Sequence, residues 1–205
     1  MKEAPHVTGR GTAIIRKAAP LAAALLLSGC ISFSAKPPPQ LISLTPAMRA
    51  PAGDLAPGST EPPLVVVNPD SVHELDQVRV PVQVNGSGVA FLKGAIWSDR
   101  PARQLRIVIA ETIRAKDNRV VYEDIGSATA GRPVLTGRLE AMGYDAASGS
   151  VVIRLDAQLA TPGGTPKLRR FEATVPGIAP EATAVGPALN RAANDLAAQV
   201  AAWVG

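Results

Sequence analysis

The chain has very little of the chemistry on which most active sites depend. It contains one cysteine, two histidines and 3% aromatic residues. A single cysteine excludes an internal disulfide, and the sequence lacks the closely spaced Cys, His or carboxylate ligands that a zinc site needs. So few aromatic side chains leave no stacking platform for single-stranded nucleic acid. No Gly-x-x-x-x-Gly-Lys run is present, so the chain does not bind and hydrolyse ATP by that route.

The positive charge of the chain lies mainly at its amino end. The whole sequence has 21 basic and 17 acidic side chains. Four of the cations and one of the anions come before Cys30, which leaves 17 basic and 16 acidic side chains from Cys30 onward. The basic character therefore says little about partners, and we expect no nucleic-acid partner.

Residues 1–29 have the pattern of a secretory signal peptide, in which basic residues precede a short apolar run and a pair of small residues. The apolar run is about 10 residues long, whereas a helix needs about 20 to cross a bilayer. Leu27-Ser-Gly-Cys30 resembles the lipobox of bacterial lipoproteins, in which the chain is cut before the cysteine and its thiol and new amino terminus are acylated. An ordinary signal peptide with a chance cysteine is the alternative.

Acylation of Cys30 would hold the protein at a membrane. One acyl chain gives marginal binding at ~0.8 kcal/mol per buried methylene, and three chains together make the attachment effectively permanent. Residues 31–39 predict a tether, because three prolines favour an extended chain that lifts the domain roughly 25–30 Å off the lipid. Residue 31 is Ile rather than the Asp that tends to retain such lipoproteins at the inner membrane. We therefore expect an outer-membrane anchor facing the periplasm of a Gram-negative bacterium.

Residues 40–205 predict one α+β domain, a mainly antiparallel sheet with two principal helices packed on it. The clearest period-two alternation lies at 151–159, flanked by segments at 135–144 and 168–175, which predicts a three-stranded meander with one apolar face. Further short strands are predicted at 41–44, 64–67, 79–84 and 120–122, and a short apolar segment lies around 89–92. Pro81 indicates that its strand lies at an edge, since proline cannot donate to the ladder.

Helical spacing predicts the two helices. One begins near Ser98 or Asp99, with Pro101 in its first turn, and the other covers about 182–204. The second helix carries a single apolar stripe of Val185, Leu189, Ala192, Leu196, Val200 and Trp203. Residues 45–63, rich in Pro, Ala and Gly, predict a mobile loop.

Each polar group that could serve chemistry has a simpler interpretation. His73 is either a surface histidine or part of a Ser-His-Asp relay, and the lack of a nucleophile-elbow glycine pattern favours the first. The pair Glu123-Asp124 is typical of a solvated turn rather than an acid–base pair. Arg103, Arg106 and Arg114 are typical of a solvated helix face. A second group of cations is typical of a solvated turn, with binding of phosphate head groups as the alternative: Lys167, Arg169 and Arg170.

No constellation in the sequence supports catalysis, so we expect neither an enzyme nor a metal or other cofactor. The features that remain are an anchor, a tether and a folded domain. They favour binding or bridging at a membrane.

Several short segments, in their order along the chain, resemble a known family. They are the lipobox, Gln40-Leu-Ile-Ser-Leu-Thr-Pro46, Leu64-Val-Val-Val-Asn-Pro69, Trp97 with Pro101, Leu135-Thr-Gly-Arg-Leu139 and Ala202-Trp203-Val204. Their order resembles the ABC-type transport auxiliary lipoprotein family, which includes paraquat-inducible protein C. The resemblance covers about residues 40–204, and it carries over no ligand residue beyond Cys30.

The resemblance implies a function. Members of this family accompany ABC transporters with mammalian-cell-entry (MCE) components, which move lipids between the two membranes of Gram-negative bacteria. The implied partners are an MCE-domain protein and the ABC transporter subunits, with this chain as their docking partner at the outer membrane. The strand near Pro81 and the region of Trp97 are the candidate partner surface, with Trp97 in the core as the alternative.

A periplasmic shuttle that carries a phospholipid in its own cavity is the alternative function. It needs a large apolar pocket between sheet and helices, and the many alanines weigh against a wide one. The sequence leaves the oligomeric state open, a homo-oligomer included.

Overall fold

The computed structural model describes residues 40–53, 61–123 and 130–205. The predicted signal peptide, Cys30, the tether and Asp124 lie outside these residues, as does the middle of the predicted loop at 45–63. The strands are β1 (Gln40–Ile42), β2 (Leu64–Val66), β3 (Asp70–Ser71), β4 (Arg79–Gln83), β5 (Val89–Trp97), β6 (Val121–Tyr122), β7 (Val134–Asp145), β8 (Ser150–Ala160) and β9 (Lys167–Val175). The helices are the short 3-10 helix η1 (His73–Leu75), α2 (Pro101–Asp117) and α3 (Ala182–Val204).

The sheet is organised around the long strand β7. One edge of β7 pairs with β8, and β8 pairs with β9, both antiparallel, which confirms the predicted meander. The opposite edge of β7 pairs in succession with β2, β3 and β4, each over two residues and each parallel. Beyond these, β6 pairs with β2, β5 with β4 and β1 with β5. The α+β class is confirmed, with a mixed sheet in which the longest ladders are antiparallel.

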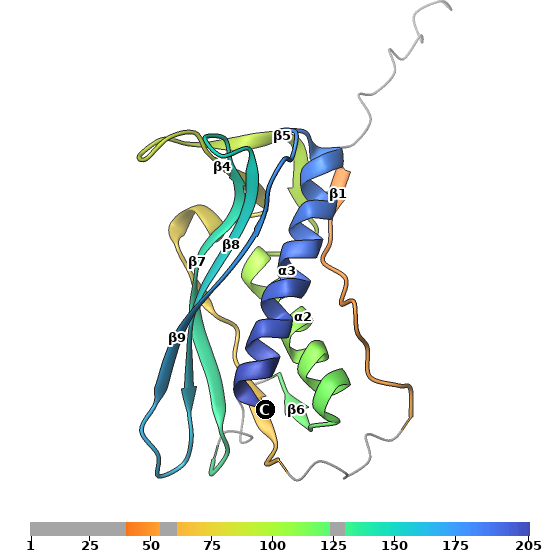
Figure 1. Cartoon of the computed structure of the whole chain (residues 1–205), viewed down its shortest axis with the longest axis vertical. Coiled ribbons are helices and arrows are strands. Elements are labelled where there is room, and N and C mark those ends of the chain that lie inside the picture. The colour runs from red at the N-terminus through yellow and green to blue at the C-terminus, as the bar shows by residue number, and fades with distance from the viewer. Residues whose placement is uncertain (1–39, 54–60, 124–129) are drawn as a thin grey trace, which may run out of the picture. The chain divides into compact units, whose positions relative to one another are not determined.

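The two long helices cover one face of this sheet. Helix α3 packs against β8 and β9, and α2 packs beside α3 (Figure 1). The predicted apolar stripe of α3 is buried except for half-buried Trp203, whose ring meets Phe171 edge-on with centroids 5.5 Å apart. Four alanines between the stripe residues are also buried, so the helix lies close to the strands with few large side chains between them: Ala188, Ala193, Ala197 and Ala201.

Buried Arg119 joins three parts of the chain at one end of the domain. Its Nε donates to the carbonyl oxygen of Pro62 at 2.7 Å, and its Nη1 donates to the carbonyl of Val204 at 2.8 Å. Burial lowers the pKa of the Arg119 guanidinium, and the carboxylates of Glu61 and Asp117 oppose that shift. The cation thus satisfies a carbonyl at the end of α3 that has no partner within the helix.

The prediction that the strand with Pro81 lies at an edge is wrong. β4 lies between β5 and β7 and pairs with both. The ladder to β5 shifts register between Arg79 and Pro81. A proline is tolerated inside a sheet at such an irregularity, because the ladder is already interrupted there.

The first part of the predicted mobile loop is fixed along the two helices. Asn190 and Asn194 of α3 accept hydrogen bonds from the backbone amides of Thr45 and Ala47, both at 2.7 Å. Gln104 and Glu111 of α2 accept from the amides of Leu44 and Ala50 at 2.8 and 2.9 Å. Residues 44–50 therefore form a strap, irregular in backbone but held by side chains.

Candidate functional site

An interruption in the strand order creates a groove at β7. On one edge of this strand, β3 pairs with Arg138 and Leu139, and β4 pairs with Tyr144 and Asp145. Within the described part of the chain, no strand pairs with residues 140–143 on that edge. The connection from β3 to β4 leaves the sheet there and forms η1 instead.

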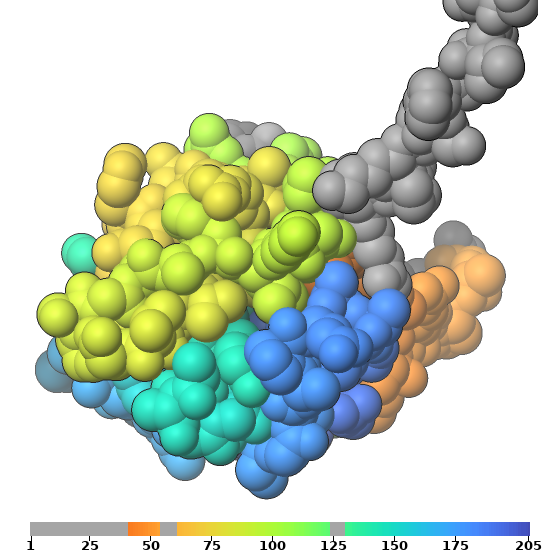
Figure 2. Space-filling model, turned by 90° about the horizontal axis from the view of Figure 1, so that it is seen from above, coloured from red at the N-terminus to blue at the C-terminus, as the bar shows by residue number. Residues whose placement is uncertain are grey.

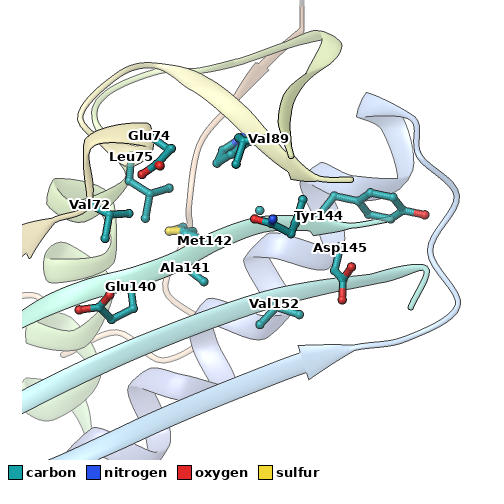
Figure 3. A pocket seen from close by; sticks show the side chains of 13 residues that line it. Val72, Glu74, Leu75, Val89, Glu140, Ala141, Met142, Tyr144, Asp145 and Val152 are labelled. Atoms are coloured by element: carbon teal, nitrogen blue, oxygen red, sulfur yellow. The ribbon is translucent and has the colours of Figure 1, made fainter. Parts of the chain in front are cut away.

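The groove is a cavity of about 270 Å³. Its lining comes from η1 and the residue before it, β4, β5, β7 and β8 (Figure 3): Val72, Glu74, Leu75, Pro81, Gln83, Val89, Glu140, Ala141, Met142, Gly143, Tyr144, Asp145 and Val152. On β8, Val151 and Ile153 are buried on the side of the helices, whereas Val152 between them is half-buried. Since side chains alternate along a strand, Val152 faces away from the helices. Met142 and Tyr144 pair with Ile153 and Val151 and therefore point to the side of the helices, so the groove lies at the unpaired edge of β7 and is lined by residues from both faces of the sheet.

The groove combines an apolar floor with carboxylates. Leu75 and Met142 are buried in its base, while Glu74, Glu140 and Asp145 also line it. None of the lining residues is Lys, Arg or His, and none is Ser, Thr or Cys. With no nucleophile and base side by side, the arrangement suits binding rather than covalent catalysis.

Two of these three carboxylates have partners within the protein. Glu140 forms an ion pair with Arg138 at 3.0 Å. Asp145 accepts hydrogen bonds from Ser148 Oγ at 2.8 Å and from the Ala147 amide at 3.0 Å, and these lower the pKa of Asp145 below its usual value. Asp145 is therefore ionised at neutral pH where it lines the groove.

The hairpin between β4 and β5 borders the groove. It projects away from the helices at the end of the domain where β1 lies (Figure 1). On this hairpin the large apolar side chains of Val84 and Val89 are 49% and 42% exposed to water. Figure 2 shows this end of the molecule, where the yellow-green hairpin segments lie beside the teal turn between β7 and β8.

The two residues expected at a partner surface have different positions. Trp97 is only 1% exposed and belongs to the core, so the alternative stated for it holds and its side chain is not on the surface. Its indole Nε1 has no hydrogen-bond partner among the described residues. Pro81 is half-buried and lines the groove.

The arginines of α2 divide into exposed and paired ones. Arg103 is 63% exposed, as expected for a solvated face. Arg106 and Arg114 are 11% and 18% exposed and pair with the carboxylate of Glu123 at 2.5 and 2.7 Å. Arg114 also donates to the carbonyl oxygen of Val121 at 2.8 Å. The expectation of a solvated face is wrong for these two arginines and for Glu123, which together join α2 to β6.

The remaining candidates lie on the surface. His73 begins η1, is exposed and makes no side-chain hydrogen bond within the described ranges. Lys167, Arg169 and Arg170 are exposed on β9, where Arg170 pairs with Asp156 at 2.6 Å. Among the residues that the structure describes, no group of three or more His, Cys, Asp or Glu could hold a metal ion. None of the described helices is long and apolar enough to cross a membrane.

Sequence reasoning placed Pro81 in this region but missed the other lining residues. Glu74 and Leu75 fell in a stretch predicted only as a polar turn, and Met142 in a strand with no sign of an interruption beside it. The run of turn residues between two short strands, 68–76, was the one local signal of a connection that leaves the sheet.

Solved structures share this fold. A DUF330 family protein of Xanthomonas campestris superposes with a TM-score of 0.62 at 17% identity, over 80% of this chain and 91% of that one. An uncharacterized protein superposes with a TM-score of 0.63 at 15% identity, over 81% of this chain and 100% of that one. A PelC dodecamer of Paraburkholderia phytofirmans superposes with a TM-score of 0.45 at 16% identity, over 70% of this chain and 89% of that one. For the first two structures, at 15–17% identity, the likeness concerns the fold alone.

The sequence, rather than the structural likeness, shows to which family the chain belongs. No curated protein matches the chain significantly. Residues 44–201, which include both long helices almost entirely and all strands from β2 onward, match the family described as ABC-type transport auxiliary lipoprotein component. The chain therefore belongs to the ABC-type transport auxiliary lipoprotein family.

Proposed function

We propose that this protein is a non-catalytic lipoprotein, anchored in the outer membrane through Cys30, that docks an MCE-type ABC transport system moving lipids between the two membranes. The family match over residues 44–201 carries the proposal. The lipobox-like Leu27-Ser-Gly-Cys30 and Ile rather than Asp at position 31 support the anchor and its location. Residues 30–39 would then be the acylated cysteine and tether, and residues 40–205 the recognition domain.

The dimensions of the groove favour docking over the alternative of a lipid shuttle. Pockets that enclose drug-sized ligands measure about 300–1,000 Å³. The groove, at about 270 Å³, lies below this range. The space between α3 and the sheet is filled by buried side chains, many of them alanine. Neither place offers room for a two-chain lipid.

The anchor is tested with the full-length Cys30→Ser protein. We expect the variant to keep its signal peptide uncut or to leave the membrane fraction after washing, while the wild type stays in outer-membrane vesicles separated by density. Normal processing and membrane retention of the variant would contradict the anchor. Recovery of the wild type with the inner membrane would contradict only its location.

The partner is tested by co-expressing the lipidated chain with the MCE protein, permease and ATPase of an MCE-type transport system from the same bacterium. We expect the chain to purify with the MCE protein after gentle extraction, and native mass spectrometry to show no bound phospholipid on the free chain. A stoichiometric co-purified phospholipid without the MCE protein would favour the shuttle. The same spectra report whether the chain self-associates.

A further inference from the structure

We propose that the groove between η1, β7 and the β4–β5 hairpin binds a polypeptide segment of a partner, one that carries a large apolar side chain with lysine or arginine beside it. The inference rests on the proposed docking function for the occupant being a protein. It specifies where on the molecule the partner docks and which side chains of the partner are bound. Three features of the groove support it, namely its volume, its charge and its rim.

The volume fits side chains rather than a whole ligand. At about 30 Å³ of liquid volume per water, a cavity of about 270 Å³ corresponds to roughly nine waters. That space accepts one or two large side chains. Its floor is apolar where Leu75 and Met142 lie, and methionine adapts its shape to different contacts.

The charge selects for cations. Glu74, Glu140 and Asp145 line the groove, and none of its lining residues is basic. Arg138 offsets the charge of Glu140, whereas Glu74 is exposed on η1. Apolar surroundings strengthen the attraction of such carboxylates for a lysine or arginine. The same carboxylates repel a lipid phosphate, which disfavours an anionic head group as the occupant.

The rim extends the apolar surface beyond the cavity. Val84 and Val89 are about half exposed on the hairpin. Isolated exposed apolar residues need no explanation, but these two lie side by side across the hairpin, and Val89 also lines the cavity, so the apolar surface continues from the cavity onto the hairpin. Protein interfaces have this anatomy, an apolar centre with charged residues at its edge.

A photo-cross-linking amino acid in place of Val89 tests the inference in the full-length lipidated protein within cells. Val89 is exposed and lines the groove, so the substituted side chain reaches whatever occupies it. The reference position is Leu168, 78% exposed on β9 at the other end of the sheet. Mass spectrometry then identifies the chemical class of the adduct and the cross-linked segment.

We expect a polypeptide adduct at Val89 whose cross-linked segment contains a large apolar residue within a few positions of a lysine or arginine. Glu74→Lys should lower its yield about tenfold, the loss of one good charge-complementary contact. Asp195→Lys, the same charge change on the exposed side of α3, should leave the yield unchanged. A phospholipid adduct, an acidic segment or a yield no greater than at Leu168 would overturn the inference.

The two proposals fail separately. If the transporter co-purifies equally with the wild type and with Glu74→Lys, and Val89 gives no adduct, the groove is not the docking site although the docking function stands. If a segment of the expected chemistry comes from a protein outside any ABC transporter, the groove inference stands and the proposed function fails.

Discussion

The two faces of the β7–β8–β9 sheet differ in what covers them. On the face beneath α3, Val151, Ile153 and Leu155 are buried against a helix whose buried residues are mostly alanine, valine and leucine. On the other face, neither α2 nor α3 covers the strands, and the side chains form ion pairs across them: Arg154 with Glu172 at 2.7 Å and Arg170 with Asp156 at 2.6 Å. One face is close-packed and the other is wet.

This difference separates stability from recognition. Close packing makes the covered face sensitive to a change of a single methylene. Exposed ion pairs contribute little, typically about 0–1 kcal/mol each. The groove lies at the edge of β7, where buried Leu75 and Met142 belong to the core and Glu74, Val84 and Val89 are exposed around it. The covered face fixes the fold, and the exposed residues around the groove can change with the partner at little cost to the core.

The largest effect should come from a leucine on the covered side. Leu189→Ala removes a side chain that is fully buried in α3 and leaves a cavity, so the free energy of unfolding should fall by about 2–5 kcal/mol in urea titrations. Leu168→Ala, the same change on exposed β9, should stay within about 0.5 kcal/mol of the wild type. Equal losses from both would break the distinction between the faces.

A smaller effect should come from Gly143, where β4 and β7 meet at the groove. An alanine Cβ at this position would collide with the carbonyl oxygen of Pro81. Moving β4 away should lower the free energy of unfolding by about 1–3 kcal/mol and reduce cross-linking from Val89. Gly86→Ala in the hairpin turn meets nothing within 4 Å and serves as control. A wild-type cross-linking yield for Gly143→Ala would show that the groove tolerates a displaced β4.

The sequence predicts well what local periodicity determines. Strict alternation in β8 and the apolar stripe of α3 each place residues on one face, and both elements are where the pattern puts them. Gly149, which ends the turn between β7 and β8, has φ +61°, a conformation that glycine adopts more readily than other residues. These features depend on neighbours a few residues apart.

The sequence does not predict what distant pairing determines. β3 and β4 pair with β7 over only two residues each, too few to leave a pattern, and the groove is the space between those pairings. Helical spacing likewise identified the apolar side of each helix but not what covers the polar side. Asn194 and Arg106 are held by a strap and by β6, elements whose sequences show no periodicity.

Asn194→Ala tests whether the polar side of α3 is part of the covered region. The asparagine accepts from the Ala47 amide at 2.7 Å and donates to the Thr45 carbonyl at 3.0 Å. Losing these bonds should weaken the strap by about 1 kcal/mol, which makes amide exchange at Ala47 about fivefold faster. Arg191→Ala, exposed on the same helix, should leave that exchange rate unchanged. An unchanged exchange rate at Ala47 in Asn194→Ala would show that the strap does not cover this side of α3.

The smallest effect should come from the ion pairs of the open face. The hydrogen bond from Arg170 lowers the pKa of Asp156, so Arg170→Ala should raise that pKa toward the ordinary value of about 3.9, as followed by carboxyl NMR titration. A lowered folded-state pKa adds stability above the unfolded-state pKa, and this stability is lost as the pH falls through the folded-state value. Any stability difference between variant and wild type should therefore vanish in acid. Asp145, whose pKa is lowered by Ser148 and Ala147 instead, should titrate unchanged in the variant. A parallel shift at Asp145 would mean that the two ends of the open face are coupled, and that recognition at the groove is not independent of the strands beside it.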